Sequence, residues 1–163
     1  MTRVNIVDPS LLTDQHLMAE ARELPHVFSY VERHYHPSKI KNVAPTYTLN
    51  AGHVTFFINK LEYVYSRMFL LVEELHKRGV DKQFDINTWN SRYAAFSTVL
   101  KQNYTPSIAE VEVNVERIVA RIMEKPTWYR YNREPLFVTE DLAVKLKSAY
   151  LGKNKSLWSA LYE

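Results

Sequence analysis

The stretch TDQHLMAEARELPHVFSYV, residues 13–31, decides the fold class. Its apolar residues recur at spacings of four and three, as on one face of an α-helix. These residues are Leu17, Ala21, Leu24, Phe28 and Val31. Thr13 can cap the helix, because its hydroxyl can accept a hydrogen bond from a backbone N–H of the first turn. Pro25 lacks a backbone N–H, so we predict a kink just after Arg22 and Glu23.

The same period predicts two further long helices. The first covers about residues 60–78, with Gly79 as its stop, and the second covers about residues 105–125, with Pro106 at its first helical position. The expected inward residues of the first are Leu61, Val64, Met68, Leu71, Val72 and Leu75, and those of the second are Ile108, Val111, Val115, Ile118, Val119 and Ile122.

The remaining segments are shorter or less regular. Residues 36–50 contain two prolines and predict a loop, and residues 86–100 predict a short helix. Residues 139–163 have a helical pattern with a break near Gly152. With only three glycines and little strand-like alternation, the chain is predicted to be all-α, with three main helices and long loops.

Composition bounds the class of protein. A chain of 163 residues with 46% hydrophobic and 24% charged residues can form one folded domain with its own core. It has no cysteine, which excludes disulfides and thiolate chemistry. We see no signal-peptide pattern and no apolar span of the roughly 20 residues that a membrane requires, so we expect a cytoplasmic, DNA-associated protein without a membrane partner.

Two polar surfaces are candidates for function. On the helix of residues 13–31, one sector away from the apolar face holds five polar side chains, for which a solvated face is the default interpretation: His16, Glu20, Arg22, Glu23 and His26. On the helix of residues 105–125, Arg117 and Arg121 lie one turn apart opposite the apolar face. They are solvated arginines by default, or a phosphate-binding ridge.

The segment Pro126-Thr-Trp-Tyr-Arg-Tyr131 is the least ordinary part of the sequence. Three aromatic residues (Trp128, Tyr129 and Tyr131) surround Arg130 in sequence, so stacking surface and positive charge occur together. Burial of Trp128 in the core is the alternative. The net charge of +3 and pI near 9.0 permit a nucleic-acid partner without requiring one. There is no metal-ligand pattern and no Gly-rich phosphate loop, so no metal or other cofactor is expected.

Several segments together resemble a known family. They are Thr2-Arg3, DQHLMAE at 14–20, RELP at 22–25, AGHVTFF at 51–57 and PTWYRY at 126–131. In order and spacing they are similar to the pyrimidine-dimer DNA glycosylase/AP lyase family of T-even phage endonuclease V. The resemblance covers residues 1 to about 133. It implies a compact helical fold with the N-terminus inserted between helices, and a division into a glycosylase-like domain (1–135) and a helical C-terminal extension (136–163) that packs on it or contacts DNA.

The resemblance also implies an activity, the base-excision repair of UV-damaged DNA. The α-amine of Thr2, free once Met1 is removed, would attack C1′ at a cyclobutane pyrimidine dimer and form a Schiff base. Glu23 would assist the β-elimination that cleaves the strand. An α-amine suits this role because its pKa is about 7.7–8.0, so roughly 10% is neutral at pH 7, against far less of a lysine. The partner would be double-stranded DNA that contains dimers, bound by a monomer.

The same resemblance implies which residues contact DNA. The expected residues are Arg3, His16, Arg22, His26, Arg117, Arg121, Trp128, Tyr129, Arg130 and Tyr131. Two of them depart from the family pattern, since His26 replaces an arginine and Arg121 a lysine. Residues 80–103 match poorly, and residues beyond about 135 have no counterpart in the phage enzyme. The alternatives are the same chemistry on another damaged base or on abasic sites, or a catalytically silent DNA-binding relative.

Overall fold

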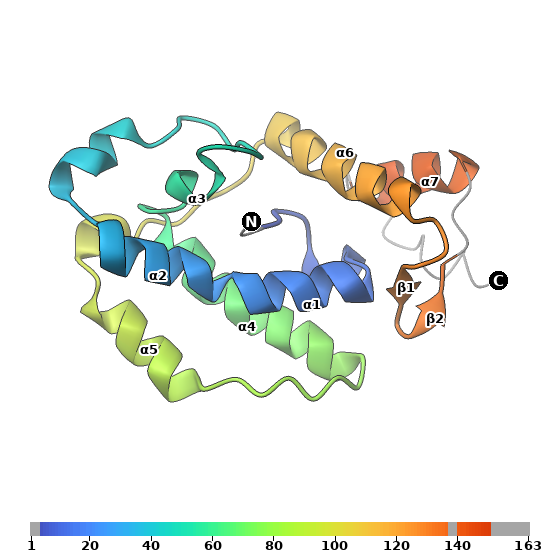
Figure 1. Cartoon of the computed structure of the whole chain (residues 1–163), viewed down its shortest axis with the longest axis horizontal. Helices are drawn as coiled ribbons and strands as arrows, with labels where there is room; N and C mark the ends of the chain where they lie inside the picture. Colours follow the sequence, from blue (N-terminus) through green and yellow to red (C-terminus); the bar gives the residue numbers. More distant parts are fainter. Residues whose placement is uncertain (1–3, 137–139, 151–163) are drawn as a thin grey trace. The chain divides into compact units, whose positions relative to one another are not determined.

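The structure is a computed structural model that describes residues 4–136 and 140–150 (Figure 1). Most of the described residues lie in helices and very few in strands, which confirms the prediction of an all-α protein. The chain divides into two units, residues 1–4 with 18–105 and residues 5–17 with 106–163. Helix α1 (Asp14–Glu23) contributes residues to both. The division expected at residue 135 stays a prediction.

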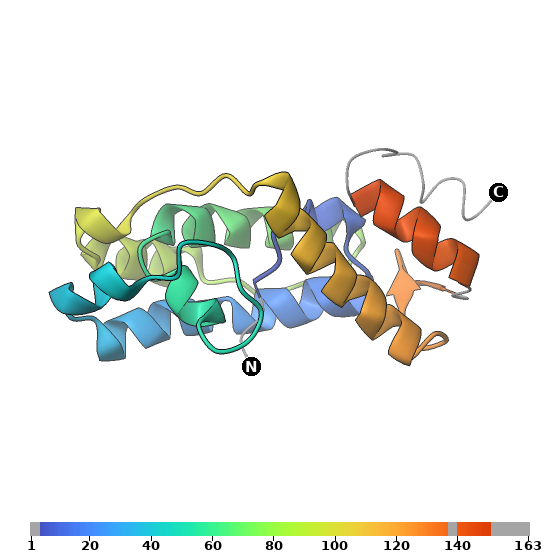
Figure 2. The same cartoon turned by 90° about the horizontal axis from the view of Figure 1, so that it is seen from above.

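The first unit contains most of the helices (Figures 1 and 2). After the end of α1 come α2 (Pro25–His34), the 3₁₀ helix η2 (Pro37–Asn42), α3 (His53–Phe56), α4 (Leu61–Lys77), α5 (Ile86–Ala95) and the 3₁₀ helix η3 (Thr98–Leu100). The helical turns η2 and α3 fall in and just after the segment that we predicted as a loop. The predicted short helix over 86–100 is present as α5 followed by η3.

The break at Pro25 has the predicted position. Helix α1 ends at Glu23, and α2 begins at Pro25, whose missing N–H is harmless in the first turn of a helix. The five apolar residues named from the repeat, Leu17, Ala21, Leu24, Phe28 and Val31, are all buried. The two helices are therefore separate elements, although one apolar pattern runs through both.

Helix α4 lies in the core of the first unit. All six of its predicted inward residues are buried, and it ends before Gly79, which adopts the left-handed conformation (φ 70°) that glycine tolerates best. Helix α5 is attached by Trp89, whose ring stacks on Phe28 with centroids 4.0 Å apart. An ion pair of 2.8 Å between Arg92 and Glu32 joins α5 to α2 as well.

The second unit is built on a long helix and a small hairpin. Its elements are the 3₁₀ helix η1 (Pro9–Leu11), the start of α1, α6 (Ile108–Glu124), the strands β1 (Arg130–Tyr131) and β2 (Glu134–Pro135), and α7 (Glu140–Tyr150). Strands β1 and β2 pair antiparallel. Helix α7 packs on α6, where Lys147 forms an ion pair with Glu116 (Figure 2). The helix predicted from residue 139 is thus described as far as residue 150, and the predicted break near Gly152 lies outside the described residues.

Helix α6 differs from its prediction at one end. It begins at Ile108, two residues after Pro106, because Ser107 and Glu110 form a capping box. Ile108 is 78% exposed, so its predicted inward position is wrong, while Val115, Ile118 and Ile122 are buried as expected. The inward face also holds a polar residue. The amide of Asn114 is buried because it binds the Asn5 side chain and the Ile6 N–H, at 3.0 and 2.8 Å.

Candidate functional site

The N-terminal segment of the first unit is fixed at Val4, the first residue that the structure describes. Val4 is buried. Its N–H donates to Nε2 of His53 at 2.9 Å, and its carbonyl accepts from the Tyr47 hydroxyl at 2.9 Å. The predicted site residues Thr2 and Arg3 lie outside the described residues.

The predicted carboxylate lies in the same unit. Glu23 is the last residue of α1 and is half-buried, so its charge is partly shielded from water. Arg22 and His26 flank it in sequence and are both exposed. For these two side chains the solvated sector expected from the helical repeat is confirmed.

The expected solvent exposure is wrong for Glu20, whose side chain is fully buried. Its carboxylate accepts two hydrogen bonds from Arg67 of α4, at 2.6 and 3.1 Å. Burial would lower the pKa of the Arg67 guanidinium, but the Glu20 carboxylate and the Tyr63 hydroxyl raise that pKa above its ordinary value. Burial also raises the pKa of Tyr63, against the opposing effect of Arg67. The sequence signal for this pair was Arg67 itself, which falls on the apolar face of α4 between Val64 and Leu71.

His16, the other exception, is buried in the second unit. Its ring stacks on Tyr129 with centroids 4.9 Å apart and planes at 9°. Its Nδ1 lies 2.7 Å from the Thr13 hydroxyl, which also accepts the His16 N–H at 3.3 Å. Thr13 therefore caps α1 as predicted, and it also orients the His16 ring. Two predicted DNA-binding residues, His16 and Tyr129, are thus in contact with each other in the interior.

The side chains of the PTWYRY segment differ in their exposure to solvent. Trp128 is 54% exposed, which excludes the core alternative for its side chain, and Arg130 is exposed beside it. Tyr131 is half-buried, and its hydroxyl donates to the Ser10 carbonyl at 2.8 Å. Trp128 and Arg130 are consequently available for stacking and for phosphate contact, whereas Tyr129 and Tyr131 attach the segment to its unit.

The first turn of α1 holds this segment in shape. Gln15 donates to the Trp128 carbonyl at 2.8 Å and accepts from the Arg130 N–H at 2.9 Å. The carboxylate of Asp14 accepts from the N–H groups of Asn132 and Arg133, at 3.0 and 2.7 Å. Neither Asp14 nor Gln15 was predicted as a site residue, although both belong to the DQHLMAE motif.

The turn between β1 and β2 needs this support. Asn132 and Arg133 have φ values of 49° and 71°, the left-handed region that disfavours side chains. Since the turn contains no glycine, the sequence carried no hairpin signal, and we did not predict these strands. The paired hydrogen bonds to Asp14 offset the backbone strain.

The arginines of α6 have different surroundings. Arg121 is exposed and forms an ion pair of 2.9 Å with Glu124, while Arg117 is half-buried. Arg121 fits the solvated interpretation. Both remain candidates for phosphate contact, since an exposed pair such as Arg121–Glu124 is worth little and is easily exchanged.

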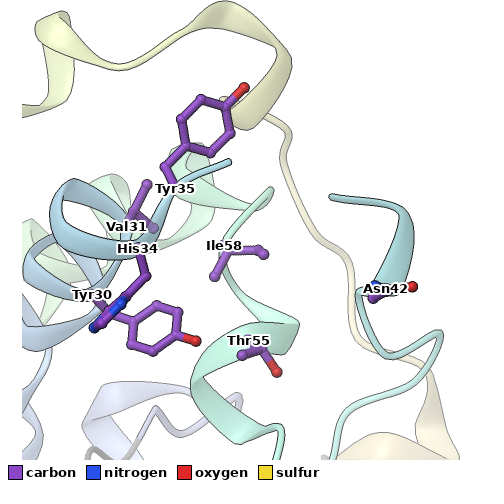
Figure 3. A pocket seen from close by; sticks show the side chains of 7 residues that line it. All are labelled: Tyr30, Val31, His34, Tyr35, Asn42, Thr55 and Ile58. Carbon is purple, nitrogen blue, oxygen red and sulfur yellow. The ribbon is translucent and has the colours of Figure 1, made fainter. Parts of the chain in front are cut away.

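A small cavity of about 180 Å³ lies in the first unit (Figure 3). It is lined by Tyr30, Val31, His34, Tyr35, Asn42, Thr55 and Ile58. Figure 3 shows Tyr30 extending from α2 toward Thr55 of α3. Among the described residues, none of the predicted site residues lines this cavity, and neither does any carboxylate, lysine or arginine. It is smaller than the roughly 300–1,000 Å³ of typical ligand sites.

The described residues contain neither a metal-binding group nor a membrane-spanning helix. In residues 4–136 and 140–150, no three His, Asp or Glu side chains are grouped so that they could bind a metal ion. Over the same residues, no helix is both long and apolar enough to cross a membrane.

Exposed Trp128 and Arg130 offer the stacking surface and the positive charge that proteins binding nucleic acids combine. Comparison with known families narrows this class. The family described as pyrimidine dimer DNA glycosylase matches residues 1–88, which is just over half of the 163 residues. The chain belongs to this family of DNA repair glycosylases. The match confirms the resemblance based on the motifs up to residue 57, whereas the PTWYRY motif lies beyond it.

Proposed function

We propose that this chain is a DNA N-glycosylase with coupled AP lyase activity on cyclobutane pyrimidine dimers. The nucleophile is the α-amine of Thr2, and Glu23 is the carboxylate that moves protons. The observation that carries this proposal is the family match, because its range of residues 1–88 includes Thr2, Arg22 and Glu23. Family membership supports the glycosylase step, and the lyase step goes beyond what the family description states.

The first step breaks the glycosidic bond. The lone pair of the neutral Thr2 amine attacks C1′ of the 5′ nucleotide of the dimer, and the bond from C1′ to the base nitrogen breaks with its electron pair on the base. The amine then loses a proton and the sugar ring opens between C1′ and O4′, which takes up a proton. The product is an iminium ion between Thr2 and C1′.

The second step cleaves the strand. The iminium ion makes the C2′ proton acidic, and the Glu23 carboxylate accepts that proton. Elimination then breaks the C3′–O bond, and the 3′ phosphate leaves with the electron pair. Water hydrolyses the remaining Schiff base and regenerates the amine. A half-buried carboxylate is suited to this work, because partial burial strengthens its attraction to the cationic intermediate.

DNA binding in this proposal uses cations and one exposed ring. Arg22, His26, Arg121 and Arg130 are exposed, and Trp128 offers a stacking surface. Arg3 and Arg117 are further proposed phosphate contacts. His16, Tyr129 and Tyr131 act mainly by holding the Trp128–Arg130 segment, since their side chains are engaged within the second unit.

Borohydride trapping tests the proposal. Protein lacking Met1, checked by intact mass, is incubated with borohydride and a duplex that carries one cis-syn thymine dimer, with undamaged and abasic duplexes alongside. A covalent adduct on the dimer duplex that maps to Thr2 is the expected result. An adduct on the abasic duplex alone would assign the lyase to another lesion. Absence of an adduct on both, or an active form that retains Met1, would overturn the mechanism.

A further inference from the structure

Both backbone polar groups of Val4 form hydrogen bonds with side chains distant in sequence. The N–H donates to His53 and the carbonyl accepts from Tyr47, each at 2.9 Å. Chain ends usually fray unless they are tied down. Here the attachment lies only two residues after Thr2, and two residues span at most about 7 Å. Because this link is short, fixing Val4 limits how far the α-amine of Thr2 can lie from the attachment.

The ring of His53 is set for this contact by its other nitrogen. Nδ1 lies 2.6 Å from the Thr48 carbonyl, which can only accept, so Nδ1 carries the proton. Nε2 is then unprotonated and accepts the Val4 N–H. The hydrogen bonds to Thr48 and Val4 therefore both require the neutral His53 ring with its proton on Nδ1.

The surroundings keep the two side chains in place. Tyr47 and His53 are buried, and Tyr47 packs edge-to-face against His53, Phe56 and Phe57. His53 starts α3 directly after Gly52, whose φ of 98° requires a glycine. This accounts for the AGHVTFF motif, since its glycine turns the chain, its histidine binds Val4 and its phenylalanines support Tyr47.

We propose that Tyr47 and His53 are positioning residues for the N-terminal nucleophile. They act through the backbone of Val4 and hold the Thr2 amine where it can attack C1′. The inference rests on the proposed function, which names Thr2 as the nucleophile. Its energetic basis is the rate advantage of a held reactant, since a misplacement of about 1 Å can cost roughly 100-fold in rate.

Three variants separate the contacts. Tyr47→Phe removes only the hydroxyl that binds the Val4 carbonyl and keeps the ring packing. His53→Asn keeps an N–H near the Nδ1 position for Thr48 and loses the acceptor for Val4. His53→Gln places its amide oxygen near the Nε2 position and restores that acceptor. Tyr65→Phe is the matched control, because it removes a hydroxyl in the same unit that binds Asn90 and is remote in sequence from Val4.

The readouts are the single-turnover rate of adduct formation, the Kd for the damaged duplex, and hydrogen exchange of the Val4 amide. We expect Tyr47→Phe and His53→Asn to slow the adduct about 10-fold with Kd changed less than about 2-fold, and His53→Gln to recover most of the rate. The Val4 amide should exchange faster in His53→Asn than in His53→Gln. Melting temperatures within a few degrees of wild type show that the fold is kept.

The outcomes distinguish this inference from the function on which it rests. If wild-type protein forms no adduct, the proposed function fails. If wild type forms the adduct and Tyr47→Phe and His53→Asn match Tyr65→Phe in rate, the positioning proposal fails alone. A parallel loss of Kd and rate in His53→Asn that His53→Gln does not reverse would also overturn it, because that pattern is a general loss of structure.

Discussion

At the scale of single residues, a substitution at Glu23 separates its effect on DNA binding from its effect on strand cleavage. It is half-buried at the end of α1 and is proposed to accept the C2′ proton. Glu23→Gln keeps the size of the side chain and removes the base. We expect strand cleavage to fall at least about 100-fold, as for loss of a general base, with Kd for the dimer duplex within about 3-fold. Quantitative cleavage and fluorescence anisotropy measure the two, with Glu73→Gln as the control for a lost carboxylate. Equal losses of cleavage and binding would contradict the assigned role.

The buried pair of Glu20 and Arg67 makes a prediction about stability. Glu20→Gln leaves the guanidinium of Arg67 buried without its countercharge, a change that costs about 3 kcal/mol or more. The matched variant Glu73→Gln breaks the exposed pair with Lys77 and should cost less than about 1 kcal/mol. Urea denaturation gives both free energies of unfolding. If the two variants lose similar free energies of unfolding, the buried pair contributes no more to stability than the exposed pair does.

At the scale of elements, the attachment of the β1–β2 hairpin to α1 should control DNA affinity. Asp14→Ala removes both acceptors of the turn at Asn132 and Arg133, so the Trp128–Arg130 surface should lose its fixed shape. We expect Kd for the dimer duplex to rise several-fold. Loss of an acidic residue would by itself tighten DNA binding, so a weaker complex identifies the structural role.

Two further variants complete this test by anisotropy. Asn132→Gly in the Asp14→Ala background should restore part of the affinity, because glycine adopts positive φ at little cost. Asp81→Ala removes an exposed acid from the first unit and should not weaken binding. If Asp14→Ala binds as tightly as Asp81→Ala, the hairpin does not depend on α1 for its function.

At the scale of the whole molecule, charge predicts how binding responds to salt. The net charge is only +3, so affinity must come from local cations such as Arg22, Arg121 and Arg130. We expect log Kd to change with log salt at a slope of about 3 to 5, since each neutralised phosphate contributes about 0.9. Arg130→Ala should lower that slope by about one, and Lys77→Ala should leave it unchanged. A flat response in wild type would exclude DNA as the ligand.

Much of the fold could be predicted because helices are local. Every apolar residue that the helical repeats of α1, α2 and α4 predicted to face inward is buried. Pro25 correctly predicted the break between α1 and α2. The start of α6 was misplaced because the capping box of Ser107 and Glu110 outweighed the preference of proline for a first helical turn. Candidate catalytic residues came from the family resemblance, and their roles stay proposals.

The sequence by itself determined the helices and the family, because periodicity, caps and motifs are written in neighbouring residues. Only the tertiary structure decided which polar residues lie inside. Glu20 binds Arg67, which lies 47 residues away, and His16 stacks on Tyr129 far along the chain, so no local pattern could pair these residues. The same holds for the turn at Asn132 and Arg133 and for the attachment of Val4, because each is stabilised by hydrogen bonds to residues that only folding brings near.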